Sequence, residues 1–179
     1  MRVNGATPTP ELKTVRLLQI PLPVYARSTQ HFDELMREFA LISLDTGRQR
    51  PSTDTARPVP LRLLQLVDQL VQDFASFTAS QEVARDEALA RGEAELDLVY
   101  ELPIAAAEAS RRLGELLEEV DDYCRSGQHL ITLATPAESL AFRRWYLDEF
   151  IGQLEDDKAP DPWPEYVAQN HPDDDWARG

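Results

Sequence analysis

The sequence has little of several residue types that mark well-known classes of protein. Cys124 is its only cysteine, so no intramolecular disulfide can form and a secreted disulfide scaffold is excluded. No stretch approaches the roughly 20 consecutive apolar residues that a membrane-spanning helix needs. The segment Met1–Lys13 lacks the apolar centre of a secretory signal peptide. We therefore expect a cytoplasmic protein that does not enter a membrane.

Glycine and histidine are also too sparse to build common catalytic or cofactor sites. The seven glycines are scattered and form neither a GxGxxG nor a GxxxxGK[ST] phosphate loop, so we expect no nucleotide cofactor. His31 lies near Asp33 and Glu34, which is the chemistry of a general base or of half a metal site. Nothing at ligand spacing completes that site, and we therefore predict no metal and no catalytic residue. A histidine that simply lines its helix is the alternative.

Positive charge is scarce as well, because 18 Lys and Arg stand against 32 Asp and Glu, a net charge of −14. Phosphate groups would be repelled by such a chain, which disfavours non-specific binding to nucleic acid and docking on an anionic membrane. The length of 179 residues fits one domain with a core of its own, and 42% apolar residues argue against global disorder.

The excess of acid is uneven along the chain. Residues 155–179 hold eight acids and two bases, a net of −6, together with four prolines. That composition predicts an extended, poorly packed, acidic C-terminal tail. Residues 45–60 are also rich in proline and poor in apolar residues, which indicates a mobile loop inside the domain. We expect a single α/β domain over 13–154, preceded by a flexible N-terminus at 1–12.

Hydrophobic periodicity within that domain predicts three strands and five helices. Leu18, Ile20 and Leu22 are expected on one face of the first strand, and Thr135 to Glu138 forms a capping-box pattern at the start of the last helix. Ser80 and Gly92 are expected to bound one short helix. The expected strands are Thr14–Leu22, Glu95–Leu102 and Leu130–Ala134, and the expected helices are 28–44, 61–77, 80–91, 103–125 and 136–154.

Strands that alternate with helices favour parallel pairing through right-handed crossovers. The predicted fold class is therefore a helix-dominated α+β or α/β fold. It has a small, about three-stranded sheet, with helices packed mostly on one face.

The densest group of recognition-type residues is Arg143, Arg144, Trp145 and Tyr146, because arginine, tryptophan and tyrosine are enriched at binding hot spots. The alternative is that these aromatic residues pack internally while the arginines pair with acids. Trp163 lies between two prolines, where it either folds back onto the domain or contacts a partner.

Two further residues have simpler expected places. Trp176, close to the end of the chain, is expected to be exposed. Cys124 lies on the apolar stripe of an acidic helix, so we expect a buried thiol with a raised pKa and not a nucleophile.

Three segments resemble a group of uncharacterised actinobacterial proteins: Leu22–Ile42, the ELDLVYELP strand, and LITLATPAESLAFRRWYLDEF followed by PWP. Genes of that group often lie beside sporulation-type serine phosphatases, STAS-domain anti-anti-sigma factors and anti-sigma kinases. The resemblance implies a regulatory role in partner-switching signalling by association. It carries no catalytic residue, and the chain has neither the ATP-binding motifs of an anti-sigma kinase nor a STAS signature.

Three hypotheses remain open at this point. The first is a non-enzymatic regulator that binds a phosphatase, STAS or anti-sigma type of protein through Arg143, Arg144, Trp145, Tyr146 and Trp163. The second is a small-ligand sensor with a pocket lined by Tyr25, His31 and Arg143. The third, an enzyme of unrecognised type, has the least support because no triad or paired carboxylates stand out.

Overall fold

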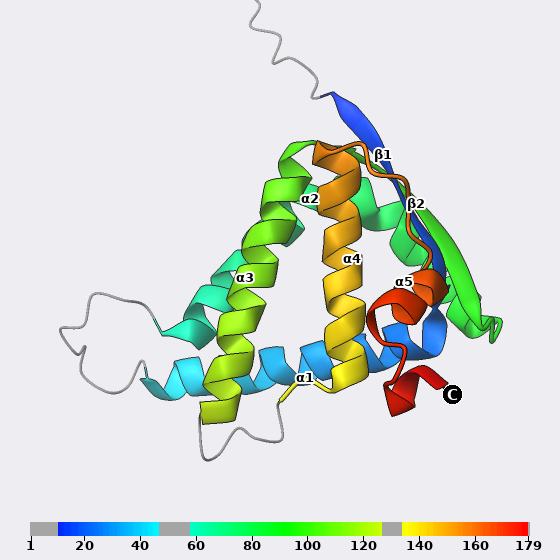
Figure 1. Cartoon of the computed structure of the whole chain (residues 1–179). Coiled ribbons are helices and arrows are strands. Elements are labelled where there is room, and N and C mark those ends of the chain that lie inside the picture. Colours follow the sequence, from blue (N-terminus) through cyan, green and yellow to red (C-terminus); the bar gives the residue numbers. More distant parts are fainter. Residues whose placement is uncertain (1–10, 47–57, 127–133, 179) are drawn as a thin grey trace, which may run out of the picture.

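The computed structural model describes residues 11–46, 58–126 and 134–178, and Figure 1 shows the arrangement of their helices and strands. Two strands lie at one side of the molecule, and the long helices lie beside them. The elements in chain order are β1 (Leu12–Pro21), α1 (Leu22–Thr46), α2 (Val59–Ala90), β2 (Glu95–Pro103), α3 (Ala105–Ser126), α4 (Ala137–Glu155), α5 (Trp163–Asn170) and a short 3₁₀ helix η2 (Asp175–Arg178).

The two strands pair antiparallel, so the predicted helix-dominated fold is confirmed while the predicted parallel pairing is wrong. The reason lies in the connection between them. Two helices, α1 and α2, separate the strands, and α2 brings the chain back to the end of β1 at which α1 begins, so β2 starts beside Pro21 and runs in the opposite direction. The third predicted strand, Leu130–Ala134, and most of the predicted loop at 45–60 lie outside the described residues.

A bulge in β1 decides which side chains of that strand face the core. The register shifts by one residue between Leu17 and Ile20, and Gln19 adopts a φ of 54°. Val15, Leu17 and Ile20 are therefore buried, whereas Leu18 is only half-buried. The predicted alternation through Leu18 was wrong because period-two reasoning assumes a strand without an extra residue.

Both outer edges of this two-stranded sheet are covered by a glutamine side chain. Gln153 of α4 accepts a hydrogen bond from the Arg16 amide at 2.8 Å and donates one to the Arg16 carbonyl at 2.8 Å. On the other edge, Gln81 of α2 donates to the Val99 carbonyl at 2.5 Å. Arg16 and Val99 are partners in the sheet register. Open strand edges invite unwanted pairing, and the two amides occupy these positions.

The helices keep the predicted order but differ in their boundaries. α2 runs without interruption through Ser80, which caps nothing, because the polar residues around it lie on an exposed face and leave the apolar stripe intact. Gly92 ends the turn after α2 with a φ of 68°, as predicted. The Thr135 hydroxyl donates to Asp121 of α3 at 2.6 Å, and α4 has no side-chain cap, so the predicted capping box does not form.

The buried side chains form two separate clusters, and these two names are used below. The sheet-side core joins the sheet to α4 and α5, and it includes Val15, Leu17, Ile20, Val24, Leu98, Tyr100, Leu102, Ala106, Ala107, Ala141, Phe142, Trp145, Phe150, Leu154 and Trp163. The helix-side core joins α1, α2 and α3, and it includes Leu35, Phe39, Leu63, Leu66, Leu116, Leu117, Val120 and Cys124.

The C-terminal segment packs on the domain and is not the extended tail that its composition predicts. Glu149 of α4 is 1% exposed, and its carboxylate accepts hydrogen bonds from Lys158 at 2.6 Å and from the Asp161 amide at 3.0 Å. The indole of Trp145 donates to the Asp161 carbonyl at 2.8 Å. These bonds hold the segment against α4 and bring Trp163 into the sheet-side core.

Candidate functional site

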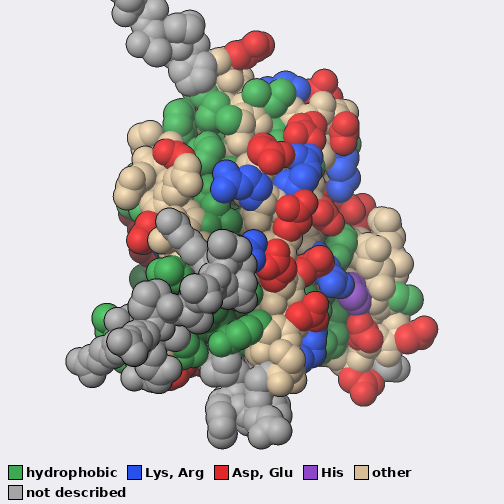
Figure 2. Space-filling model, turned by 90° about the vertical axis from the view of Figure 1, so that its left-hand side faces the viewer, with side chains coloured by type: hydrophobic (Ala, Val, Ile, Leu, Met, Phe, Trp, Pro, Cys, Tyr) green, Lys and Arg blue, Asp and Glu red, His purple; other side chains and the backbone are tan. Residues whose placement is uncertain are grey.

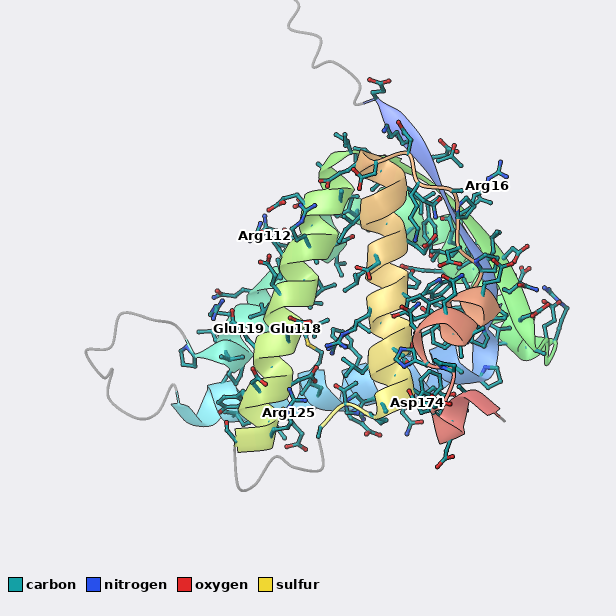
Figure 3. All side chains as sticks on the ribbon, in the orientation of Figure 1. Arg16, Arg112, Glu118, Glu119, Arg125 and Asp174 are labelled. Atoms are coloured by element: carbon teal, nitrogen blue, oxygen red, sulfur yellow. The ribbon has the colours of Figure 1, made fainter. Side chains whose placement is uncertain are left out.

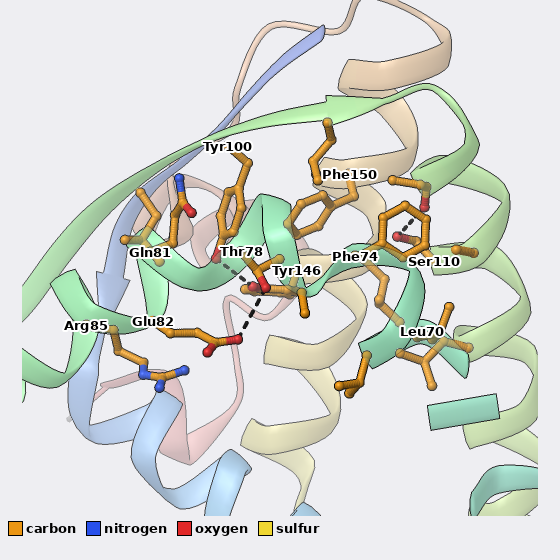
Figure 4. Close-up of a pocket in the computed structure, with 18 of the residues that line it drawn as sticks. Leu70, Phe74, Thr78, Gln81, Glu82, Arg85, Tyr100, Ser110, Tyr146 and Phe150 are labelled. Atoms are coloured by element: carbon orange, nitrogen blue, oxygen red, sulfur yellow. Dashed lines mark hydrogen bonds between the residues drawn. The ribbon is translucent and has the colours of Figure 1, made fainter. Parts of the chain in front are cut away.

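A cavity of about 310 Å³ opens into the sheet-side core beneath α2 (Figure 4). Its volume is at the lower end of the range of small-molecule sites. Helix α2 forms one wall, β2 and α4 form the opposite side, and α3 closes one end. Its lining residues are Tyr25, Leu70, Val71, Phe74, Ala75, Thr78, Gln81, Glu82, Arg85, Leu98, Tyr100, Leu102, Ala106, Ala109, Ser110, Leu113, Tyr146, Leu147 and Phe150.

The cavity is apolar at one end and polar at the other. Leu70, Phe74 and Leu113 lie at the apolar end, where α2 passes α3. Steps of three and four residues along α2 place Thr78, Gln81 and Arg85 on the same face about one, two and three turns after Phe74. One helix face therefore supplies both ends, and a bound molecule would lie along α2.

Two tyrosines meet in the middle of the cavity. The hydroxyls of Tyr100 on β2 and Tyr146 on α4 are 3.1 Å apart and share one hydrogen bond, in which either is able to donate. The ring of Phe150 lies against both, with centroids 5.2 Å from Tyr100 and 5.1 Å from Tyr146. Figure 4 shows the three rings together beside α2.

Burial determines the protonation of this pair. It raises the pKa of Tyr100 to about 12, and it raises the pKa of Tyr146 well above the ordinary value. Both phenols are therefore neutral near pH 7. Their mutual bond uses one of two hydroxyl hydrogens, and among the described residues the other hydrogen has no acceptor. The cavity thus contains one hydrogen-bond donor that a ligand or a water molecule must satisfy.

The polar end carries one charge of each sign. Arg85 donates to the Tyr25 hydroxyl at 2.8 Å and to the Asp86 carboxylate at 2.8 and 2.9 Å. Burial opposes its charge, but these bonds to Asp86 and Tyr25 raise the pKa of Arg85, which stays protonated. Glu82 accepts a bond from the Thr78 hydroxyl at 3.2 Å, and within the described ranges it forms no ion pair.

The predicted surface of four residues on α4 does not form. Trp145 is 1% exposed in the sheet-side core, and Tyr146 lines the cavity. Arg143 forms a largely buried ion pair with Asp121 of α3 at 2.5 Å. Only Arg144 is exposed, with its guanidinium 3.6 Å from Glu118. Trp145 and Tyr146 pack inside the molecule and both arginines lie against acids, so the alternative of internal packing is the one that the structure has.

The remaining sequence candidates are also dispersed. His31 does not line the cavity, and its buried Nε2 has no hydrogen-bond partner among the described residues. Burial is the main cause that lowers the His31 pKa, and the charge of Arg143 adds to it, while Glu34 and Asp121 oppose them. Of the three residues in the predicted sensor pocket, Tyr25 lines the cavity, whereas His31 and Arg143 lie outside it.

Of the two tryptophans near the C-terminus, Trp163 lies in one of its expected places and Trp176 does not. Trp163 folds back into the sheet-side core, which is one of the two alternatives that the sequence left open. Trp176 stacks against it with ring centroids 6.2 Å apart and is half-buried, not exposed. Proline-flanked Trp163 is therefore an anchor for its own chain.

Cys124 is fully buried in the helix-side core, as predicted. Desolvation raises the pKa of its thiol, and Asp121 adds to the effect, while Arg125 opposes it. Such a thiol is a poor nucleophile.

Among the described residues outside the cavity, most lysines and arginines form an ion pair with an acidic side chain. On the face that carries α3, basic and acidic side chains alternate without a patch of one sign (Figure 2). Arg62 pairs with Glu119 at 2.6 Å and Arg125 with Asp122 at 2.7 Å. Glu118 and Glu119 are labelled on α3 in Figure 3. Exposed pairs of this kind contribute little to stability and leave no strong field on this face.

Three comparisons, with protein-family models, with curated proteins and with solved structures, each found no match for this chain. The resemblance to the actinobacterial group thus stays a prediction. In residues 11–46, 58–126 and 134–178, no helix is long and apolar enough to cross a bilayer. The same ranges hold no cluster of three or more His, Cys, Asp or Glu suited to a metal ion.

Proposed function

We propose that this protein is a sensor that binds a small, largely apolar molecule in the cavity beneath α2. The observation that supports this most directly is the unsatisfied phenol hydrogen of Tyr100 and Tyr146 in the middle of a mostly apolar, open cavity. Native cores are close-packed and leave few voids larger than a water molecule. A cavity of this size with a donor at its centre is the usual form of a ligand site.

The chemistry of the cavity favours binding over catalysis. A phenol must lose its proton to act as a base or nucleophile, and burial raises the pKa of both Tyr100 and Tyr146. Arg85 is held by Asp86 and Tyr25, which makes it a fixed donor at the rim and not a proton carrier. These groups are suited to orienting a ligand.

We propose that α2 is the element that transmits ligand binding to the surface of the protein. It contributes Leu70, Phe74 and Arg85 to the cavity, and its Gln81 bonds to the edge of β2 at Val99. A ligand that fills the space beneath α2 adds contacts to this wall. Occupancy would therefore strengthen the attachment of α2 to the sheet, which changes the surface that a downstream partner meets.

A thermal-shift screen of uncharged, acidic and basic small molecules tests the proposal. A ligand that binds only the folded protein stabilises it by RT ln(1+[L]/Kd), so the melting temperature rises with ligand concentration. The variant Ala109→Phe fills the cavity from α3 and is expected to abolish the shift. Ala40→Phe makes the same change at an exposed position on α1 and is expected to retain it.

The screen decides between clear outcomes. A hit that stabilises the wild type and Ala40→Phe, but not Ala109→Phe, supports binding in the cavity. Equal stabilisation of all three proteins would place the ligand elsewhere. A flat response to a broad set of compounds would count against a sensor.

A further inference from the structure

The cavity also constrains which class of ligand it accepts. Resting on the proposed binding function, we infer that the ligand is an uncharged aromatic molecule with one oxygen acceptor, which the phenol pair of Tyr100 and Tyr146 binds. Three features of the cavity lead to this class: the free phenol donor at its centre, the charged groups at its rim and its aromatic walls.

The free donor requires an acceptor. Tyr100 and Tyr146 are neutral near pH 7 and share one hydrogen bond, so one O–H is left over. A carbonyl or ether oxygen on the ligand satisfies it. A ligand without an acceptor would leave a buried donor unpaired, which costs more than the bond itself contributes.

The charges at the rim match neither an anion nor a cation. An anionic ligand that approaches Arg85 meets a guanidinium already bonded to Asp86 and Tyr25, with the Glu82 carboxylate nearby. A cationic ligand would meet the Glu82 carboxylate only at the rim, where Arg85 also lies, and would have to leave that partner to move further in. Deeper in the cavity the walls are apolar, and burying an unpaired charge there is expensive. An uncharged molecule avoids both costs.

The walls are suited to a ring. Phe74 on α2 faces Phe150, Tyr100 and Tyr146 across the cavity, as Figure 4 shows. The rings of Phe150 and the two tyrosines already meet in edge and tilted geometries. Aromatic groups gain further stabilisation in such arrangements beyond their buried area. A flat ring between Phe74 and Phe150 would place its substituent near the phenol pair.

Four probes that share a benzene ring separate the possible classes: acetophenone, ethylbenzene, benzoate and benzylammonium. Their dissociation constants are measured by amide chemical-shift titration with the full chain. The measurements use the wild type and the double variant Tyr100→Phe with Tyr146→Phe. Tyr123→Phe, on α3 beside Phe39 in the helix-side core, is the matched control. Circular dichroism checks that each variant is folded.

We expect acetophenone to bind the wild type and to shift amides of the cavity walls. The preference for acetophenone over ethylbenzene, as a ratio of dissociation constants, should fall about three- to tenfold in the double variant and stay unchanged in Tyr123→Phe. Comparing the same two probes across variants cancels their different solubilities. If the double variant does not fold, the rank of acetophenone against ethylbenzene and the two charged probes on the wild type still tests the class.

The outcomes separate this inference from the proposed function. Tighter binding of benzoate or benzylammonium than of acetophenone would overturn the uncharged class and leave the cavity proposal standing. An unchanged ratio in the folded double variant, with shifts still in the cavity, would overturn the role of the phenol pair alone. Failure of all four probes would overturn the aromatic class, and the Ala109→Phe screen would decide separately on the cavity.

Discussion

The two cores of this protein are packed with different kinds of side chain. The helix-side core is built from aliphatic residues, Phe39 and the thiol of Cys124. The sheet-side core is built around aromatic rings and encloses polar groups, among them the carboxylate of Glu149 and the amide of Gln153. Only the second has the open cavity described above.

The difference follows from what each core has to join. Three helices form the helix-side core, and aliphatic side chains interdigitate along their faces without polar atoms to satisfy. The sheet-side core must also cover a strand edge and hold the C-terminal segment, which requires hydrogen bonds in buried places. Glu149 and Gln153 supply these bonds. The candidate site lies among the rings of this core.

The largest expected effect compares one phenylalanine from each core. Phe39→Ala empties a fully buried position in the helix-side core and should reduce the free energy of unfolding by about 3–5 kcal/mol. Phe74 already faces the cavity on one side and is half-buried, so Phe74→Ala should cost only about 1–2 kcal/mol. Urea unfolding of both variants measures the two values. Equal losses would mean that the wall at Phe74 is packed on both sides in solution.

The next comparison concerns the neighbours Arg143 and Arg144 on α4. Arg143→Ala leaves the buried Asp121 carboxylate without its guanidinium and should cost about 3 kcal/mol. Arg144 is 54% exposed with a loose contact to Glu118, so Arg144→Ala should change stability by less than about 0.5 kcal/mol.

Chemical denaturation measures the stability of these two variants, and a binding assay measures their association with a partner. A large loss of stability from Arg144→Ala would show that its ion pair is part of the structural network. Co-purification with a candidate regulatory protein, weakened by Arg144→Ala but not by a stability-matched core variant, would instead support the interaction hypothesis.

The sequence predicted the elements better than their arrangement. Periodicity located the apolar faces of α1, α3 and β2, since those faces repeat without interruption. It placed Leu18 on the wrong side because nothing in the local pattern marks the bulge at Gln19. The antiparallel pairing depends on how two consecutive helices reverse the chain, which is a property of the tertiary structure and not of either helix alone.

The candidate site was even less accessible to sequence reasoning. Two residues carry a signal in the sequence: Tyr100 places a polar hydroxyl on the inward face of a strand, and Tyr146 lies in the aromatic group on α4. Nothing in the sequence singles out Arg85, because its contact with Tyr25 arises only when α2 lies over the sheet. The proline-rich segment was misjudged for the same reason, since Glu149 and Trp145 hold it from a distant helix.

The smallest expected effect is a pH dependence confined to the sheet-side core. Tyrosines in an unfolded chain lose their proton near pH 10, whereas burial raises the pKa of Tyr100 to about 12. Between these values the unfolded state binds fewer protons than the folded state, so stability is complete below pH 10 and falls as pH rises. Tyr100 alone should account for a loss of about 1 kcal/mol by about pH 11.

Urea unfolding at several alkaline pH values should therefore give a steeper decline in the free energy of unfolding for the wild type than for Tyr100→Phe with Tyr146→Phe. Parallel curves, or tyrosinate absorbance that appears in full near pH 10 in the folded protein, would show that water reaches the phenol pair freely. That result would remove the distinction between a protected polar centre in this core and an ordinary solvent-filled surface groove.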